Sequence, residues 1–146
     1  MPRCVDCKTE KPHEEFYGIK KKASRCKQCQ SKYLKAYRAK ERTAALIAYG
    51  GENPTCSCPG CSEDRFPFLC IDHINGGGCK HREELCKDQL NNRDDAVKFF
   101  MGKCSPGGGV FYRWLRKNLY PSGYRVLCYN CNTARSNGPC PVHESS

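Results

Sequence analysis

One short segment organises this chain: Leu127-Cys128-Tyr129-Asn130-Cys131-Asn132. Its two cysteines have the C-x2-C spacing of a turn that presents two thiolates to one zinc ion. Cys58 and Cys61 repeat this spacing near the middle of the chain, and Cys56 is an alternative to Cys58 because the run is C-x-C-x2-C. We expect the two pairs to close one tetrahedral zinc site. A site of four cysteines has no vacant position, so this zinc would be structural.

Asn132 follows the second cysteine pair directly and places an amide oxygen beside the zinc-bound turn. Far upstream, residues 65–74 are expected to form a strand that leads into Asp72-His73, whose side chains point to opposite sides. A carboxylate and an amide oxygen are hard ligands suited to Mg²⁺ or Mn²⁺. His73, with an ordinary pKa of about 6.5, is largely neutral at neutral pH and can accept a proton from water. The sequence therefore predicts a metal ion held by Asp72 and Asn132 beside a general base, His73.

The amino-terminal segment carries a second zinc pattern. Two C-x2-C pairs separated by an 18-residue spacer predict a zinc finger with these ligands: Cys4, Cys7, Cys26 and Cys29. A segment this polar buries too little to fold without the metal. We expect Phe16 and Tyr17 to pack over the finger site.

Other cysteines and histidines leave a third zinc site open. The candidate ligands are Cys79, His81, Cys86, Cys104, Cys140 and His143. Their irregular spacing favours buried free thiols over a third site. His81-Arg82 follows a glycine loop, and this pair is expected either to contact a phosphate or to be an exposed helix start.

Composition limits the classes of protein. The chain has 146 residues, 14 of them cysteine, with 38% hydrophobic residues, and its mean hydropathy is −0.75. No apolar run approaches the roughly 18 residues that cross a bilayer, and no signal peptide is expected. We therefore expect no membrane partner and a reducing, cytoplasmic location, where cysteines bind zinc rather than pair.

The charge is concentrated at one end. Lysine and arginine number 25 against 15 acidic residues, a net charge of +10, of which residues 1–50 contribute +8. Such an excess favours a polyanionic partner. A merely soluble basic protein is the alternative.

A helical pattern covers residues 27–49 and ends at Gly50-Gly51. One face of this helix is expected to be apolar, with Tyr33, Ala36, Tyr37, Ala44, Ile47 and Ala48. The opposite face is basic, with Lys32, Lys35, Arg38 and Arg42. Because the basic face adjoins the finger, we favour contacts with DNA phosphates over an ordinary solvated face.

The expected elements indicate a small α+β fold stabilised by zinc. Strands are expected at 65–74 and 124–127, and helices at 82–101, at 110–118 and from near Cys131. A module of residues 1–40, with the finger and basic helix, is expected to precede a domain of residues 41–146. That domain would carry a helical insertion at about 79–120.

The chain also resembles a known family. Ile71-Asp72-His73 with Leu127-Cys128-x2-Cys131-Asn132 is similar to the His-Me finger (ββα-metal) nucleases, in particular phage HNH proteins and recombination endonuclease VII. Further similarity lies in Tyr49-Gly50-Gly51, Ile74-Asn75-Gly76-Gly77-Gly78 and Phe111-Tyr112-Arg113-Trp114-Leu115. The resemblance covers residues 45–143 and implies a treble-clef-like ββα core that cleaves DNA to 5′-phosphate and 3′-hydroxyl ends. It implies that Asp72 and Asn132 bind the catalytic ion and that His73 is the base.

Two features differ from the family pattern. The insertion between the two strands is longer than in the smallest members, and the middle asparagine has no clear counterpart. The residue that orients His73 is therefore unassigned, with Asn118 or a backbone carbonyl as alternatives.

Two other functions compete with a DNA endonuclease. A zinc-finger DNA-binding regulator would use the finger and basic helix but would not need Asp72, His73 and Asn132 together. A structural zinc protein of a phage particle or replication complex would show no salt-dependent DNA binding. For an endonuclease, a homodimer is the simplest route to a double-strand break.

Overall fold

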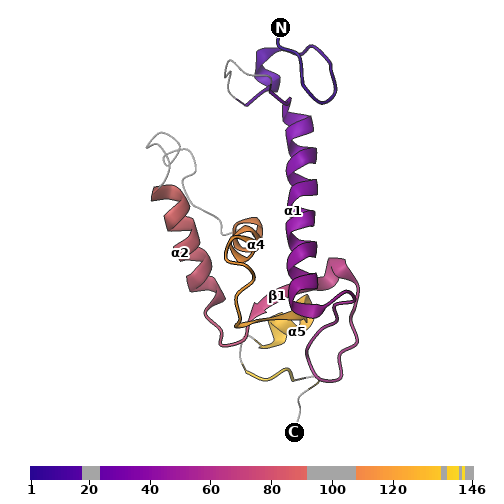
Figure 1. The fold of residues 1–146 in the computed structure, drawn as a ribbon, viewed down its shortest axis with the longest axis vertical. Helices are drawn as coiled ribbons and strands as arrows, with labels where there is room; N and C mark the ends of the chain where they lie inside the picture. The colour runs from indigo at the N-terminus through magenta and orange to yellow at the C-terminus, as the bar shows by residue number, and fades with distance from the viewer. Residues whose placement is uncertain (18–23, 92–107, 136–137, 142, 144–146) are drawn as a thin grey trace. The chain divides into compact units, whose positions relative to one another are not determined.

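The computed structural model describes residues 1–17, 24–91, 108–135, 138–141 and 143 (Figure 1). The chain forms two compact units, Met1–Lys40 and Glu41–Ser146. The fold is a small α+β fold with a two-stranded sheet and several cysteine groups that can hold zinc. None of the helices within the described residues is long and apolar enough to cross a membrane.

The first unit is built around its cysteines. Isolated bridges pair Arg3 with Glu10 and Phe16 with Cys26, and a 3-10 turn, η1, spans His13–Glu15. Phe16 packs with the buried cysteines as expected. Tyr17 is 72% exposed, so its predicted packing over the site is wrong.

Helix α1 (Lys27–Gly50) confirms the helix predicted at 27–49. It ends where Gly51, at φ 79°, adopts a backbone conformation that glycine allows without strain, and the Gly51 N–H donates to the Ile47 carbonyl at 2.8 Å. The predicted apolar face is wrong: Tyr33 and Ile47 are exposed. The residues that α1 buries are Glu41, Ala45 and Leu46.

An ion pair explains why the buried face of α1 differs from the predicted apolar face. Glu41 is 7% exposed, and both of its carboxylate oxygens accept from the Arg116 guanidinium, at 2.8 and 2.9 Å. A paired carboxylate can be buried, so periodicity of apolar residues alone did not identify this face.

Strands β1 (Leu69–His73) and β2 (Tyr124–Cys128) form an antiparallel pair. The 3-10 turn η2 (Phe66–Phe68) occupies the start of the predicted first strand. Leu69 lies opposite Cys128, and Asp72 lies opposite Arg125. The sheet therefore carries the Asp72-His73 step at one end and the cysteine turn at the other.

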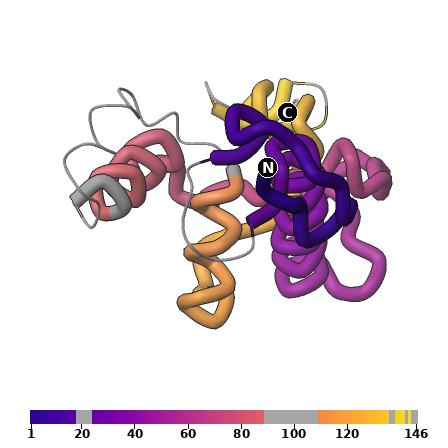
Figure 2. Tube along the Cα trace, turned by 90° about the horizontal axis from the view of Figure 1, so that it is seen from above, coloured from indigo at the N-terminus to yellow at the C-terminus, as the bar shows by residue number. Residues whose placement is uncertain are grey.

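In the described part of the second unit, three helices follow the first strand along the chain. Helix α2 (Gly78–Asn91) begins four residues before the predicted start, and the rest of that predicted helix, residues 92–101, lies outside the described residues. Helix α4 (Gly108–Lys117) contacts α2, and the two views show these helices as neighbours (Figures 1 and 2). Helix α5 (Tyr129–Ala134) follows β2 directly and contacts both strands.

The core of the second unit lies between the sheet and the helices. Its most deeply buried side chains include Leu46 of α1, Leu69 of β1, Leu115 of α4 and Leu127 of β2. Burying such leucines stabilises the fold by about 1.5–3 kcal/mol each. The same core includes four cysteines from separate stretches, so packing and metal ligation would support each other: Cys56, Cys58, Cys128 and Cys131.

Candidate active site and metal centres

A hollow of about 480 Å³ in the second unit contains the residues that the sequence singled out. Asp72 and His73 line it from the end of β1, and Asn132 lines it from α5. Three cationic side chains line the same hollow: Arg82, Arg125 and Arg135. The structure therefore brings a carboxylate, an imidazole and an amide together at one concave surface.

Asp72 forms an ion pair across the sheet. The Arg125 Nε atom donates to Asp72 Oδ2 at 2.9 Å, and the two side chains are 28% and 19% exposed. Their opposed positions in the β-ladder fix this contact. It uses one carboxylate oxygen, so the other oxygen can serve a cation.

His73 sits among aromatic rings. Phe111 of α4 stacks on it with a centroid distance of 5.0 Å, and Tyr124 of β2 meets it edge-on at 4.8 Å. Burial lowers the pKa of His73 below its ordinary value of 6.5; the charge of His81 lowers it further, Asp72 raises it and Arg82 lowers it. Burial thus favours the neutral imidazole, the form that accepts a proton.

His81 orients the imidazole of His73. His73 Nε2 lies 2.9 Å from His81 Nδ1, and Trp114 supports the His81 ring edge-on at 4.5 Å. When His73 Nε2 donates to His81, the His73 Nδ1 atom carries the lone pair. Asn118, one sequence alternative for this role, instead donates to the Trp114 carbonyl at 2.9 Å.

The start of α2 lies directly against the other nitrogen of His73. A Cβ atom added at Gly78 would come within 2.9 Å of His73 Nδ1. Only a glycine gives the backbone this close approach without displacing the ring. The base is therefore held between His81 on one side and the first residue of α2 on the other.

Asn132 is oriented by the core. Its Nδ2 atom donates to the Cys70 Sγ atom at 3.4 Å. Burial raises the pKa of Cys70 to about 11, while the contact with Asn132 lowers it. With its nitrogen engaged by this thiol, the amide presents its oxygen as the remaining ligand atom.

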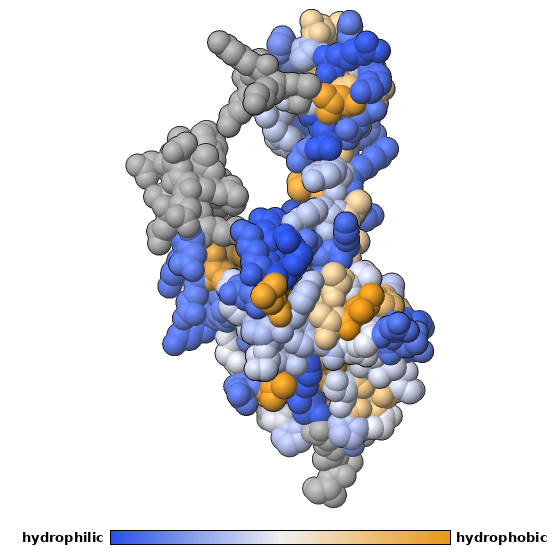
Figure 3. Space-filling view, viewed as in Figure 1, coloured by the Kyte–Doolittle hydropathy of each residue, from blue (hydrophilic) through white to orange (hydrophobic). Residues whose placement is uncertain are grey.

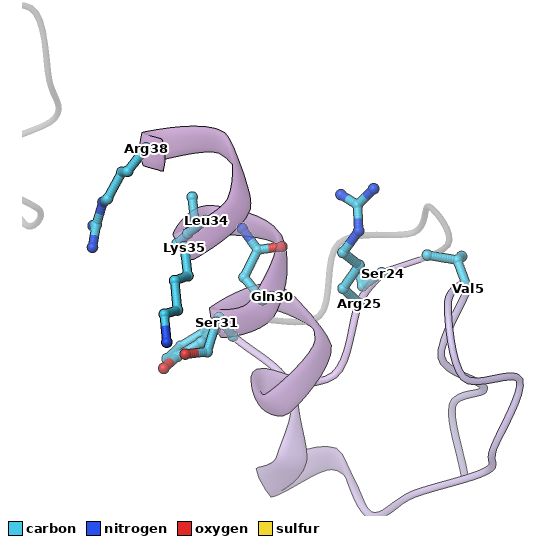
Figure 4. Close-up of a pocket in the computed structure, with 9 residues that line it drawn as sticks. Val5, Ser24, Arg25, Gln30, Ser31, Leu34, Lys35 and Arg38 are labelled. Carbon is cyan, nitrogen blue, oxygen red and sulfur yellow. The ribbon is translucent and has the colours of Figure 1, made fainter. Parts of the chain in front are cut away.

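The predicted basic face of α1 divides into two parts. Lys32, Lys35 and Arg38 are exposed in the first unit, whose visible surface is largely hydrophilic (Figure 3). Lys35 and Arg38, with Arg25 from the segment before α1, line a hollow of about 1030 Å³ (Figure 4).

Arg42 differs from those three side chains. Its Nη2 atom donates to the backbone carbonyls of Phe66, Pro67 and Leu69 at 2.7, 3.0 and 2.5 Å. These bonds anchor α1 to the η2 turn and the start of β1. Arg42 therefore has a structural role, and its contact with phosphate stays a prediction.

Cysteine and histidine side chains form three groups that can hold a metal ion among the described residues. In each group the ligand atoms lie within 4.8 Å of one another. The first group is the predicted finger set, Cys4, Cys7, Cys26 and Cys29. The Cys26 N–H donates to Cys4 Sγ at 3.3 Å, and this bond is the largest cause of the lowered pKa of Cys4, about 6. A lowered pKa favours the thiolate that zinc requires.

The second group contains Cys56, Cys61, Cys128 and Cys131. Here Cys56 takes the place of Cys58, an alternative that the C-x-C-x2-C run had left open. Cys61 Sγ and Cys128 Sγ are 4.0 Å apart. An ideal tetrahedral zinc site has an S···S edge of about 3.8 Å, from its Zn–S distance of ~2.3 Å.

The third group contains Cys58, Cys131, Cys140 and His143, so two of the candidate ligands of a third zinc site, Cys140 and His143, lie together with two other cysteines. Cys140 and His143 stand close together near the carboxyl end, and the tail brings both to Cys58, although their spacing matches no standard pattern. Cys79 is exposed rather than buried. Cys86 is buried but disulfide-bonded, and Cys104 lies outside the described residues.

Comparison of the chain with protein-family models, with curated proteins and with solved structures found no match.

Three residues have roles that were not predicted: Arg125 and Arg135, which line the hollow, and His81, which contacts His73. His81 was predicted either to contact a phosphate or to be an exposed residue at a helix start, and nothing in the sequence indicated its contact with His73. Arg125 could have been found from the strand register, because it lies opposite Asp72. Arg135 follows α5, and only the folded turn brings it to Asp72 and Asn132.

Proposed function

We propose that this protein is a metal-dependent DNA endonuclease of the HNH type. The observation that carries the proposal is the shared hollow of Asp72, His73 and Asn132. Hydrolysis of a phosphodiester needs a base for water, a cation for the developing charge, and groups that position the phosphate. The side chains of this hollow offer all three.

The donor set fits a magnesium-type ion. Magnesium usually keeps several waters and takes only one or two protein carboxylates, which matches one carboxylate oxygen of Asp72 and the amide oxygen of Asn132. When bound, such an ion would stabilise charge on the phosphate oxygens and on the departing oxygen. The cysteine groups suit zinc and not magnesium, so the two kinds of metal would have separate sites.

His73 would take a proton from the attacking water through its Nδ1 atom. Its Nε2 atom would donate to His81 Nδ1, so the ring is held in the tautomer that a base needs. Stacking on Phe111 fixes the ring plane. A base positioned in this way accelerates such reactions by about 10²–10⁴-fold.

Arginines would hold the DNA backbone at the site. Arg82, Arg125 and Arg135 present guanidinium groups that bind phosphate oxygens in pairs. Arg125 also holds Asp72 Oδ2 at 2.9 Å, so a phosphate that binds Arg125 would compete with this ion pair. Lys32, Lys35 and Arg38 would contribute contacts with DNA phosphates from the first unit.

The test is nicking of supercoiled plasmid by zinc-loaded protein with added Mg²⁺. We expect wild-type protein to nick the plasmid and His73→Ala to lose nicking while it keeps its affinity for DNA and its zinc content. His13→Ala, a substitution at an exposed histidine of the first unit, is the matched control. Equal inactivity of wild type and His73→Ala, with salt-dependent DNA binding intact, would favour the non-catalytic zinc-finger regulator instead.

A further inference from the structure

Two of the three metal-ligand groups share one side chain. Cys131 belongs both to the group with Cys56, Cys61 and Cys128 and to the group with Cys58, Cys140 and His143. Each group keeps its ligand atoms within 4.8 Å of one another. The Cys131 sulfur is therefore a ligand atom that the two groups share.

The number of ligands matches two tetrahedra joined at one corner. Zinc in structural sites is almost always four-coordinate and tetrahedral. Two separate sites need eight ligand atoms, whereas two sites that share one thiolate need seven. The two groups together contain six cysteine sulfurs and one histidine nitrogen, which is seven ligand atoms.

The surroundings of His143 support a metal rather than a hydrogen-bonded cluster. His143 Nδ1 lies 3.4 Å from the sulfur of Cys58, 3.4 Å from that of Cys131 and 3.4 Å from that of Cys140. One imidazole nitrogen carries either one proton or one lone pair, so it cannot satisfy three thiols at once. In a tetrahedral zinc site the N···S edge is about 3.6 Å, from Zn–N of ~2.0–2.1 Å and Zn–S of ~2.3 Å. Three equal contacts close to this length fit the ligand geometry of a tetrahedral zinc site.

We propose that the second unit binds two zinc ions joined by the Cys131 thiolate. One ion takes Cys56, Cys61, Cys128 and Cys131, and the other takes Cys58, Cys131, Cys140 and His143. With six thiolates and two dications the cluster carries a charge of about −2.

Nearby donors balance the charge of the cluster. Arg135 Nη2 lies 3.5 Å from Cys58 Sγ. Backbone N–H groups donate to two other sulfurs: Cys128 N–H to Cys56 Sγ at 3.2 Å and Cys131 N–H to Cys128 Sγ at 3.3 Å. Donors of this kind stabilise thiolates and are therefore expected around a bridged cluster.

The second ion would tie the end of the chain to the candidate active site. Cys140 and His143 come from the segment after α5, and Cys58 comes from the loop before β1. The shared Cys131 directly precedes Asn132, and Arg135 contacts both Cys58 and the hollow. A bridged cluster would thus hold α5 from two sides.

Counting zinc in the intact, purified chain tests this inference without reference to cleavage. After dialysis against metal-free buffer, elemental analysis is expected to find three zinc ions per wild-type chain, one in the finger and two in the cluster. Cys140→Ser and His143→Ala should each hold two. Cys79→Ser and His13→Ala, whose side chains are exposed and outside all three groups, should hold three. Two zinc ions in the wild type, whichever variant lowers the number, would overturn the bridged cluster.

Cadmium substitution tests the bridge itself and needs no variant. In protein loaded with ¹¹³Cd, we expect three cadmium resonances and correlations from the β-protons of Cys131 to two of them. If the Cys131 protons correlate with one cadmium only, the two groups are alternative or separate sites and the inference is wrong.

Discussion

The Nε2 atom of His73 lies 2.9 Å from the Nδ1 atom of His81. His73 stands at the end of β1 and His81 in the first turns of α2, so the contact joins the sheet to the inserted helix. The partner of His73 sets both its tautomer and its ring orientation. We therefore propose that His81 orients His73, a role for which the sequence alone indicated no single residue.

Replacement of His81 tests this positioning role. His81→Ala removes the acceptor and should lower the rate of plasmid nicking by about 10–100-fold, the usual effect of losing an orienting partner. His81→Asn can place its Oδ1 atom near the former Nδ1 position and should recover much of the loss. Single-turnover rates at saturating protein measure the effect. Equal losses for the alanine and asparagine variants would contradict a role through the hydrogen bond.

Gly78→Ala probes the space beside the His73 Nδ1 atom. The added methyl group would lie 2.9 Å from this nitrogen, so the ring must shift or the approach of water is blocked. We expect the nicking rate to fall by about 10–100-fold, since a displacement of about 1 Å at a reacting group can cost 100-fold.

The loss of activity in Gly78→Ala should not be accompanied by a comparable loss of stability. Alanine is favoured over glycine in helices by about 1 kcal/mol, which opposes any cost of the clash. Lys80→Ala, at an exposed position of the same helix, is the control and should cleave at the wild-type rate. A Gly78→Ala protein with normal cleavage would show that Nδ1 is not the reactive nitrogen.

Much of the local structure was predictable because its signals are local. The helix at 27–49, the strand before Asp72 and the strand before Cys128 all follow from periodicity and from glycine or cysteine turns. The finger ligands follow from two C-x2-C pairs and their spacer. In each case a few neighbouring residues carry the information.

The features that sequence reasoning missed depend on distant contacts. The buried face of α1 follows from Arg116, which pairs with Glu41. Cys56, and not Cys58, joins the group of Cys61, Cys128 and Cys131, while Cys58 lies with Cys140 and His143 from near the carboxyl end. No pattern within one segment encodes either pairing, so only the folded chain identifies them.

The Glu41–Arg116 pair should contribute to the stability of the second unit. Arg116→Met leaves the carboxylate of Glu41, 7% exposed, without the two bonds from Nε. Bonds to charged groups contribute about 1.5–3 kcal/mol. Because the Arg116 side chain is 46% exposed, we expect a loss near the lower end, about 1.5 kcal/mol.

Urea unfolding of zinc-loaded protein measures this loss. Lys117→Met, at the neighbouring exposed position, is the control and should change the free energy of unfolding by less than about 0.5 kcal/mol. The pair has no stabilising role if the two variants unfold at the same urea concentration.

Salt dependence of DNA binding separates Arg42 from the other basic residues of α1. Lys32→Gln, Lys35→Gln and Arg38→Gln should each reduce the slope of log affinity against log salt by about 1. Arg42→Gln should leave the slope unchanged and lower the thermal stability, because Arg42 binds three backbone carbonyls. A reduced slope for Arg42→Gln with normal stability would show that Arg42 contacts DNA phosphates.

The most direct measurement is the single-turnover cleavage rate of a DNA duplex by Asp72→Ala, by His73→Ala and by the double variant, all at the same Mg²⁺ concentration. Groups that act as one site are strongly non-additive. We predict that each single variant slows cleavage by at least about 100-fold and that the double variant is no slower than the slower single one. Wild-type rates in either single variant, with folding and DNA binding intact, would contradict a shared catalytic site at Asp72 and His73.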